Sequence, residues 1–185
     1  ILARRQRQMC IRDRSNTPLL FIHNTTGFMV GKKHEQSGMI NSGSQLIHAV
    51  AGSTVPHISL QIGNSYGAGN YAMCGRSFNP RFLFSYPNSK SGVMGAEQLA
   101  GVMEIVKINS DLKKNKKIDK RQLNRDKKKL IIDAEQKASI WHTTSEVMDD
   151  GVIDPRETRN HLKVCLEVIY KEKIKGSESY GTFRM

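Results

Sequence analysis

Residues 55–76 read VPHISLQIGNSYGAGNYAMCGR, and this stretch decides the fold. Its first part alternates polar with apolar residues, in the order His57, Ile58, Ser59, Leu60, Gln61 and Ile62. A period of two predicts a β-strand over residues 55–62. Glycines follow at positions 63, 67 and 69, and we expect a helix to begin near Tyr71. A strand, a glycine-rich turn and a helix start together leave backbone N–H groups facing outward, where they suit an anionic oxygen.

The chain upstream repeats part of this arrangement. Residues 19–23 predict a buried strand, and residues 24–31 form a second loop that contains Gly27 and ends at Gly31. Neighbouring strands would bring residues 24–31 and 63–70 side by side, so that one backbone N–H from each loop meets the same oxygen. Such a pair of donors is an oxyanion hole, which needs no acidic or basic side chain.

Strands and helices alternate further along the chain. We expect a helix over residues 35–51, strands over 82–86 and 91–93, and a helix from 94 to about 106. This repeated order of strand, loop and helix predicts an α/β fold.

The last third of the chain reads as mostly helical. Residues 107–137 predict a charged, exposed helix, which continues through 138–148 with Trp141 as its one large anchor. Asp154 followed by Pro155 predicts the start of a final helix that ends at Gly176. Its buried stripe follows the spacing i, i+3, i+4, i+7 and consists of Leu162, Cys165, Leu166 and Ile169.

The formal net charge of +12 comes mainly from two segments, with a net +4 over residues 1–14 and +7 over residues 107–137. Such segments suit nucleic acid or an acidic surface, so a non-catalytic basic binding module is one alternative function. The run at 107–137 has no aromatic residue on which a base could stack, and we therefore expect no nucleic-acid partner. No apolar run reaches the roughly 20 residues of a membrane span, so we expect no membrane partner either.

Nicotinamide chemistry is a second alternative, because residues 67–72 match the G-x-G-x-x-G/A pattern of dinucleotide-binding proteins. That pattern requires an acidic residue roughly 20 positions further on, to hold the ribose. Residues 85–90 read SYPNSK and supply no acid. The sequence therefore disfavours this alternative.

Cysteine and histidine side chains favour structural roles. The three cysteines, Cys10, Cys74 and Cys165, stand far apart in the sequence. We therefore expect no metal site, no disulfide and a reducing compartment. Cys74 reads as a small buried hydrophobe rather than a nucleophile. Without an evident partner, the histidines at positions 23, 48 and 57 read as structural rather than as bases.

The beginning of the chain differs from the rest. Residues 1–15 show neither strand alternation nor a long apolar helix face. We expect a disordered or foreign leader there, followed by one domain over residues 16–185 that includes the lysine-rich segment.

Several runs together closely resemble the carboxyltransferase (beta) subunits of biotin-dependent acyl-CoA carboxylases, namely residues 16–33, 65–76, 80–83, 93–98, 149–155 and 183–185. The resemblance covers about 16–106 and 138–185, and it extends only to the C-terminal half of the family chain. At residues 66–71 the chain reads YGAGNY, which is most similar to the methylcrotonoyl-CoA branch of the family. The propionyl-CoA branch usually reads YGGAYD there, and the geranoyl-CoA branch is a close alternative.

The resemblance implies a crotonase-like (ClpP/crotonase) fold of repeated ββα units. It also implies transfer of CO2 from carboxybiotin to 3-methylcrotonoyl-CoA in leucine degradation, with geranoyl-CoA or propionyl-CoA as alternative acyl substrates. In this family the half that resembles our chain receives carboxybiotin, whereas the other half receives most of the acyl-CoA. We therefore expect the 185-residue chain to be inactive by itself.

The resemblance also implies roles for particular residues. The backbone N–H groups of Ala68 and Gly69, helped by Gly27 and Phe28, would stabilise negative charge on the ureido oxygen of biotin. The cofactor-binding positions carried over from the family are Met29, Val30, Tyr66, Gly67, Asn70 and Tyr71. The implied partners are an acyl-CoA, a biotin-carrying alpha subunit and further beta subunits, with the site at a dimer interface. The implied compartment is the mitochondrial matrix in a eukaryote and the cytoplasm otherwise.

Overall fold

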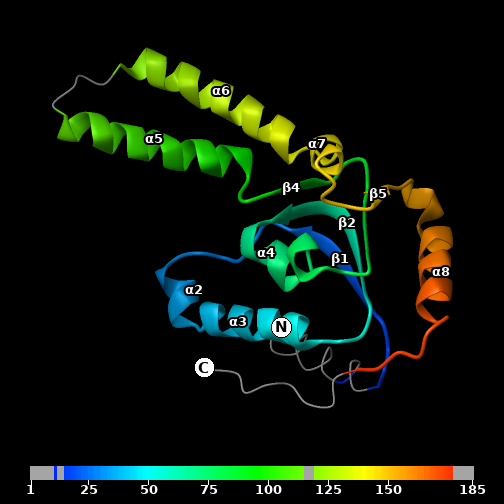
Figure 1. Cartoon of the computed structure of the whole chain (residues 1–185). Helices are drawn as coiled ribbons and strands as arrows, with labels where there is room; N and C mark the ends of the chain where they lie inside the picture. Colours follow the sequence, from blue (N-terminus) through cyan, green and yellow to red (C-terminus); the bar gives the residue numbers. More distant parts are fainter. Residues whose placement is uncertain (1–10, 12–14, 115–118, 177–185) are drawn as a thin grey trace.

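The computed structural model describes residue 11 and residues 15–114 and 119–176 (Figure 1). Its centre is a five-stranded sheet in which every strand pair is parallel. The strands are β1 (Leu19–Thr25), β2 (His57–Tyr66), β3 (Phe82–Ser85), β4 (Lys90–Gly92) and β5 (Gly151–Val152). Their order is β1-β2-β3-β5, and β4 also pairs with β2.

The long strand β2 organises the sheet. β1 runs along one of its edges, with Leu19 opposite His57 at one end and Thr25 opposite Ser65 at the other. The second edge is shared, because β3 pairs with the first half of β2 and β4 with its last residues. Most of β2 is buried, as expected for a parallel strand covered on both faces. The ends of β1 and β2 therefore reach the same edge of the sheet.

Helices cover opposite faces of this sheet (Figure 1). On one face, α3 (Met39–Gly52) and α4 (Gly67–Ala72) pack against β1 in a core built around Phe21, Leu46 and Val50. On the other face, α8 (Thr158–Ile169) packs against β2 and β3 through Cys165 and Ile169. Side chains alternate across a strand, so neighbouring residues of β1 and β2 contribute to different layers.

Two long helices, α5 (Ala96–Lys113) and α6 (Lys120–Ala138), lie side by side and project from the body (Figure 1). Ion pairs join them, Lys107 with Asp126 and Lys127 with Glu104. The lysine-rich segment therefore contains the end of α5 and nearly all of α6, which form a helical hairpin. We predicted a single helix over 107–137, and that prediction was wrong. The short elements are α2 (Lys32–Gln36), η1 (Arg76–Phe78), α7 (Ile140–Ser145) and η2 (Pro155–Glu157).

The junction between β2 and α4 differs from the prediction. The strand continues to Tyr66, and the helix begins at Gly67 instead of near Tyr71. Gly63 therefore belongs to the strand, whereas Gly67 and Gly69 belong to the first turn of the helix. The period-two pattern underestimated the strand because Gly63 and Asn64 have low strand propensity, which pairing with β1 and β4 overrides here.

Three further predictions were wrong. The helix expected over residues 35–51 is two helices, interrupted at Ser37 and Gly38, where Gly38 has φ 85°. Trp141 is not an anchor, because its side chain is 62% exposed while the neighbouring Ile140 is 1% exposed. The final helix ends at Ile169 rather than Gly176.

The start of that last helical segment agrees with the prediction, since the Asp154 carboxylate accepts the N–H of Arg156. Its first turn is the 3-10 helix η2. Residues 1–10 and 12–14, where we expected a leader, and the run 183–185 lie outside the described residues. None of the helices that the structure describes has the length and apolar composition needed to cross a bilayer.

Candidate active site

The two glycine-containing loops converge at the carboxyl ends of β1 and β2, as the sequence predicted. Thr25 and Ser65 face each other in register. The approach beyond them is very close: a Cβ added to Gly69 would lie 2.9 Å from Thr25 Oγ1 and 3.1 Å from the Cα of Gly27. Only a glycine at position 69 leaves the two backbone segments this near to each other.

The first turn of α4 supplies backbone donors at this edge. The N–H groups of Gly67, Ala68 and Gly69 precede the point where bonding to residue i−4 within the helix can begin. Gly67 has φ +53°, and a Cβ there would lie 2.9 Å from the Val93 carbonyl oxygen. The strand therefore turns into the helix without an intervening loop. Ala68 is exposed, whereas Gly69 is buried beneath the β1 loop.

The β1 loop contributes less than predicted. The Gly27 N–H donates to Thr25 Oγ1 at 3.2 Å, so it is used in a local turn. The Phe28 side chain packs against the core formed by α3 and α4 and holds the loop down. The Gly27 N–H is therefore engaged within the loop, and the Phe28 N–H stays the predicted donor from this side.

The predicted cofactor-binding residues fall into two groups. Met29, Val30 and Tyr71 lie on the surface, with side chains 61%, 84% and 46% exposed. In contrast, Tyr66 is 7% exposed, and the Asn70 amide nitrogen donates to Ser65 Oγ at 2.8 Å. The first group can contact an incoming ligand, whereas the side chains of Tyr66 and Asn70 support the turn from inside. The catalytic and binding roles of all these residues stay predictions.

His23 is a buried structural histidine, as predicted, but its link to Ser65 was not predicted. His23 Nδ1 lies 2.9 Å from Ser65 Oγ, and His23 and Ser65 are fully buried. Burial lowers the pKa of His23 to about 4, an effect that the Met73 backbone partly opposes. Among the described residues, His23 Nε2 has no partner within normal hydrogen-bond range. The available signal was His23 itself, a histidine at the end of a predicted buried strand, where apolar residues are usual. Ser65 fell in the predicted loop over residues 63–70 and gave no such signal.

Cys74 and His57 have the structural roles that we predicted. Cys74 is fully buried, which raises the pKa of its thiol to about 12 and makes it a poor nucleophile. His57 bonds to Ser53 Oγ at 2.9 Å and to Cys74 Sγ at 3.2 Å. Both residues pack the layer between α4 and the sheet.

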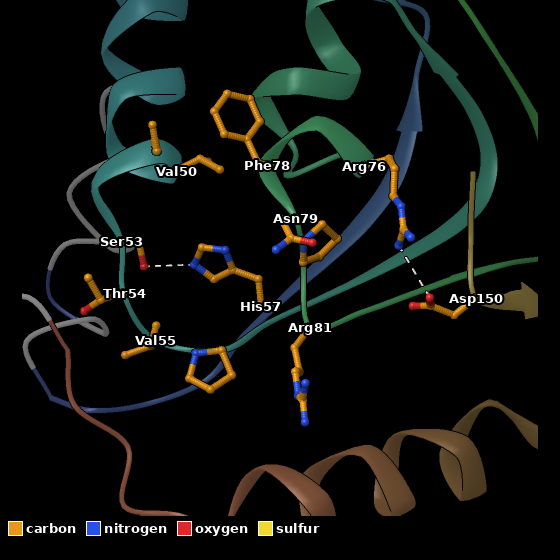
Figure 2. A pocket seen from close by; sticks show the side chains of 13 residues that line it. Val50, Ser53, Thr54, Val55, His57, Arg76, Phe78, Asn79, Arg81 and Asp150 are labelled. Atoms are coloured by element: carbon orange, nitrogen blue, oxygen red, sulfur yellow. Dashed lines mark hydrogen bonds and ion pairs between the residues drawn. The ribbon is translucent and has the colours of Figure 1, made fainter. Parts of the chain in front are cut away.

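A second hollow, of about 520 Å³, lies at the amino ends of the strands (Figure 2). Its charged groups do not converge. Arg76 points toward Asp150, with which it forms an ion pair at 3.4 Å, while the Arg81 side chain extends away from that pair (Figure 2). Arg81 also stacks on the Phe82 ring, 5.7 Å from its centroid. This arrangement makes the hollow a weaker candidate than the edge carrying the glycine loops.

Within the described residues, no group of three or more His, Cys, Asp or Glu side chains is placed to hold a metal ion. The candidate site consists of the backbone of the β1 loop and of the first turn of α4.

Comparison with known proteins identifies the family of this chain. The family model for the carboxyl transferase domain matches residues 3–180. The chain belongs to this family. Its crotonase-like α/β fold was correctly predicted, since over its whole length the chain superposes on the crystal structure of the geranyl-CoA carboxylase beta subunit from P. aeruginosa with a TM-score of 0.83 and 40% sequence identity.

Named relatives belong to the same class of enzyme. The chain is 48% identical over 175 residues to a probable biotin-dependent acyl-coenzyme A carboxylase beta2 subunit of Mycobacterium tuberculosis. It is 42% identical over 169 residues to the mitochondrial methylcrotonoyl-CoA carboxylase beta chain of Dictyostelium discoideum. These alignments cover 95% and 91% of this chain but 33% and 29% of the relatives. The chain also covers 35% of the geranyl-CoA carboxylase subunit, so it spans about a third of each.

Proposed function

We propose that this chain is the biotin-side part of the carboxyltransferase subunit of a methylcrotonoyl-CoA carboxylase. The observation that carries the proposal is the meeting of Thr25–Gly27 with the first turn of α4 across Gly69. Two backbone segments this close together would allow an N–H from each to donate to one oxygen, as carboxyl transfer through an oxyanion requires.

Methylcrotonoyl-CoA is the preferred acyl group because of the sequence YGAGNY at residues 66–71 and the similarity to the Dictyostelium chain. A geranoyl-CoA substrate is the leading alternative, supported by the 40% identity to the geranyl-CoA carboxylase subunit. The acyl group would be selected mainly by the part of the enzyme that binds acyl-CoA. Propionyl-CoA is the least favoured of the three substrates, because the propionyl-CoA branch usually reads YGGAYD where this chain reads YGAGNY at residues 66–71.

The site fits biotin in two respects. The close packing of Gly69 against Thr25 and Gly27 keeps the β1 loop beside the exposed first turn of α4 at Ala68, and Met29 and Val30 of the same loop present exposed apolar side chains. When bound, carboxybiotin would supply the carboxyl group and, after losing it, a nitrogen that accepts a proton from the acyl substrate.

The chain itself would contribute binding, orientation and charge stabilisation. The N–H groups of Ala68 and Gly69 would donate to the ureido oxygen, and Phe28 N–H would approach from the other loop. These donors are held by the strand ends before any ligand arrives, so little reorganisation accompanies the reaction. Removing one such donor typically costs roughly 3–4 kcal/mol of barrier.

The proposed partners are an acyl-CoA, a biotin-carrying alpha subunit and further beta subunits that complete the site. The compartment depends on the host. A eukaryotic host would place the enzyme in mitochondria, as the name of the Dictyostelium relative indicates for that protein, and the pathway would be leucine degradation. A bacterial host, as for the Mycobacterium relative, would place it in the cytoplasm.

The test is a carboxylation assay of the subunit expressed with its upstream coding sequence and assembled with its biotin-carrying subunit. Labelled bicarbonate and ATP are supplied with 3-methylcrotonoyl-CoA, geranoyl-CoA or propionyl-CoA. We expect the highest kcat/KM with 3-methylcrotonoyl-CoA, no product after avidin treatment, and no turnover by the 185-residue chain alone. A preference for geranoyl-CoA would overturn the substrate, and activity of the isolated chain would overturn the division between two halves.

A further inference from the structure

The chain contains a buried polar connection beneath the proposed oxyanion site. Asn70 Nδ2 donates to Ser65 Oγ at 2.8 Å, and Ser65 Oγ lies 2.9 Å from His23 Nδ1. The three residues come from α4, β2 and β1 respectively. They therefore link both strands and the helix that carry the two loops.

We propose that His23, acting through Ser65 and Asn70, is a positioning residue that fixes the first turn of α4 against the β1 loop, where the oxyanion donors must lie. This inference rests on the function proposed above and adds His23 and Ser65, which are fully buried and would not touch the ligand.

The geometry carries the proposal in three ways. First, the hydrogen bond from Asn70 to Ser65 spans the junction at Tyr66 and Gly67, so it fixes the rotation of α4 about its axis relative to β2. Second, His23 lies two residues before Thr25 on the strand whose loop meets Gly69. Third, the chain leaves room for this connection, since a Cβ on Gly75 would collide with Asn70 Oδ1.

The protonation state suits a fixed support. A neutral imidazole keeps Nδ1 able to accept the hydroxyl proton of Ser65, while that hydroxyl oxygen accepts from Asn70. Because burial holds the pKa of His23 near 4, the ring stays neutral across the working pH range. His23 is then a positional element and not the general base of the reaction.

His57 offers a matched control. It is also a buried histidine on a strand of the same sheet and also bonds to a serine, Ser53, but it lies at the amino end (Figure 2). Replacing either ring should reduce stability. Only the ring at the carboxyl end should affect the reaction.

The experiment compares His23→Leu, His23→Asn, Ser65→Ala and His57→Leu in the assembled holoenzyme, using whichever of the three acyl-CoAs the wild type carboxylates. We expect His23→Leu and Ser65→Ala to lower kcat about 10- to 100-fold, the scale of a displaced reacting geometry, with KM for acyl-CoA unchanged within about twofold. His23→Asn, whose amide oxygen can still accept from Ser65, should recover much of the rate. His57→Leu should lower the melting temperature but keep kcat within about twofold.

Four results decide the matter. Equal losses of kcat in His23→Leu and His57→Leu would overturn the proposal, as would an Asn variant no better than Leu. If the plot of kcat against pH loses one limb between pH 6 and 9 in His23→Asn, His23 acts as an acid or base in the reaction, and the positioning role is wrong. If His23→Leu does not assemble, Ser65→Ala and His23→Asn give the same comparison. A wild-type holoenzyme that carboxylates none of the three acyl-CoAs refutes the proposed function, and in that case the melting temperatures of the variants separate the structural effects.

Discussion

The two ends of the parallel sheet contain similar residues but differ in what those residues can do. At the carboxyl end, His23 and Ser65 support backbone groups from two loops that meet at Gly69. At the amino end, His57, Arg76 and Asp150 line a hollow in which each is paired with another protein group. Polar side chains in a hollow therefore do not by themselves mark a site. Convergence of groups on a common point, from elements that hold them rigidly, distinguishes the carboxyl end.

The largest effect is expected when the β1 loop is moved away from the first turn of α4. Gly69→Ala would place a methyl group against Thr25 and Gly27, and we expect carboxylation by the holoenzyme to fall by about 100-fold or more. Gly101→Ala is the matched control, since a Cβ there meets no atom within 4 Å. It lies within α5 and should stabilise the helix by roughly 0.5–1 kcal/mol with the rate unchanged. Full activity of Gly69→Ala would mean that the loops need not approach closely.

The second test concerns the pH dependence of stability at the carboxyl end. The pKa of His23 is about 4 in the folded chain and 6.5 ordinarily, so between these values the unfolded chain binds the extra proton. The free energy of unfolding should therefore fall as the pH falls from about 6.5 to about 4, by up to about 3 kcal/mol from this residue. Urea denaturation at pH 7.5 and pH 4.5 would measure the difference. His23→Asn should reduce it, and an unchanged pH dependence in that variant would count against the assignment.

The third test asks whether the amino end of the sheet contributes to stability but not to catalysis. Asp150 Oδ2 accepts the N–H of Leu83 at 2.7 Å and the residue pairs with Arg76 at the surface. Asp150→Ala should cost about 1–3 kcal/mol of stability, because a buried N–H loses its acceptor. Asp150→Asn keeps an acceptor and should cost less, measured by chemical denaturation. Carboxylation by either variant should stay within about twofold of wild type, and a large loss of rate would give the amino end a part in catalysis.

The smallest effect is expected outside both ends, in the hairpin of α5 and α6. Glu104→Gln removes the ion pair with Lys127, which joins the two helices at 2.8 Å. Both side chains are partly exposed, so the loss should be about 0–1 kcal/mol and should vanish at high salt. Thermal melting at two salt concentrations would show this. A larger loss that does not depend on salt would indicate that Glu104 stabilises the hairpin by packing or hydrogen bonding rather than by its charge.

The sequence predicted the parts of the fold that depend on local pattern. The strand cores of β1, β2 and β3, the Asp154–Pro155 helix start and the meeting of two glycine loops all followed from periodicity and turn chemistry. The boundaries that failed depend on tertiary contacts. β2 extends past Gly63 because Thr25 of β1 pairs with Ser65 and β4 pairs with residues 64–66. Ile140 rather than Trp141 is buried because the chain turns at Ser139.

The candidate site was predictable only in its backbone. Glycine spacing indicated which N–H groups could converge, but the engagement of Gly27 by Thr25 and the buried link from His23 to Asn70 depend on the register between β1 and β2. A register is a pairing between distant segments, which the composition of neither segment reveals.

The direct passage of β2 into α4 at Gly67 also restricts how this protein can vary. An α-helix turns by about 100° per residue, so a single residue inserted or deleted between Tyr66 and Gly67 would swing Asn70 to a different side of the helix. A flexible loop could absorb such a change in length, but this junction contains no loop. Insertions and deletions here would therefore disrupt the site, and a new specificity at this edge would have to come from replacing side chains on an unchanged backbone.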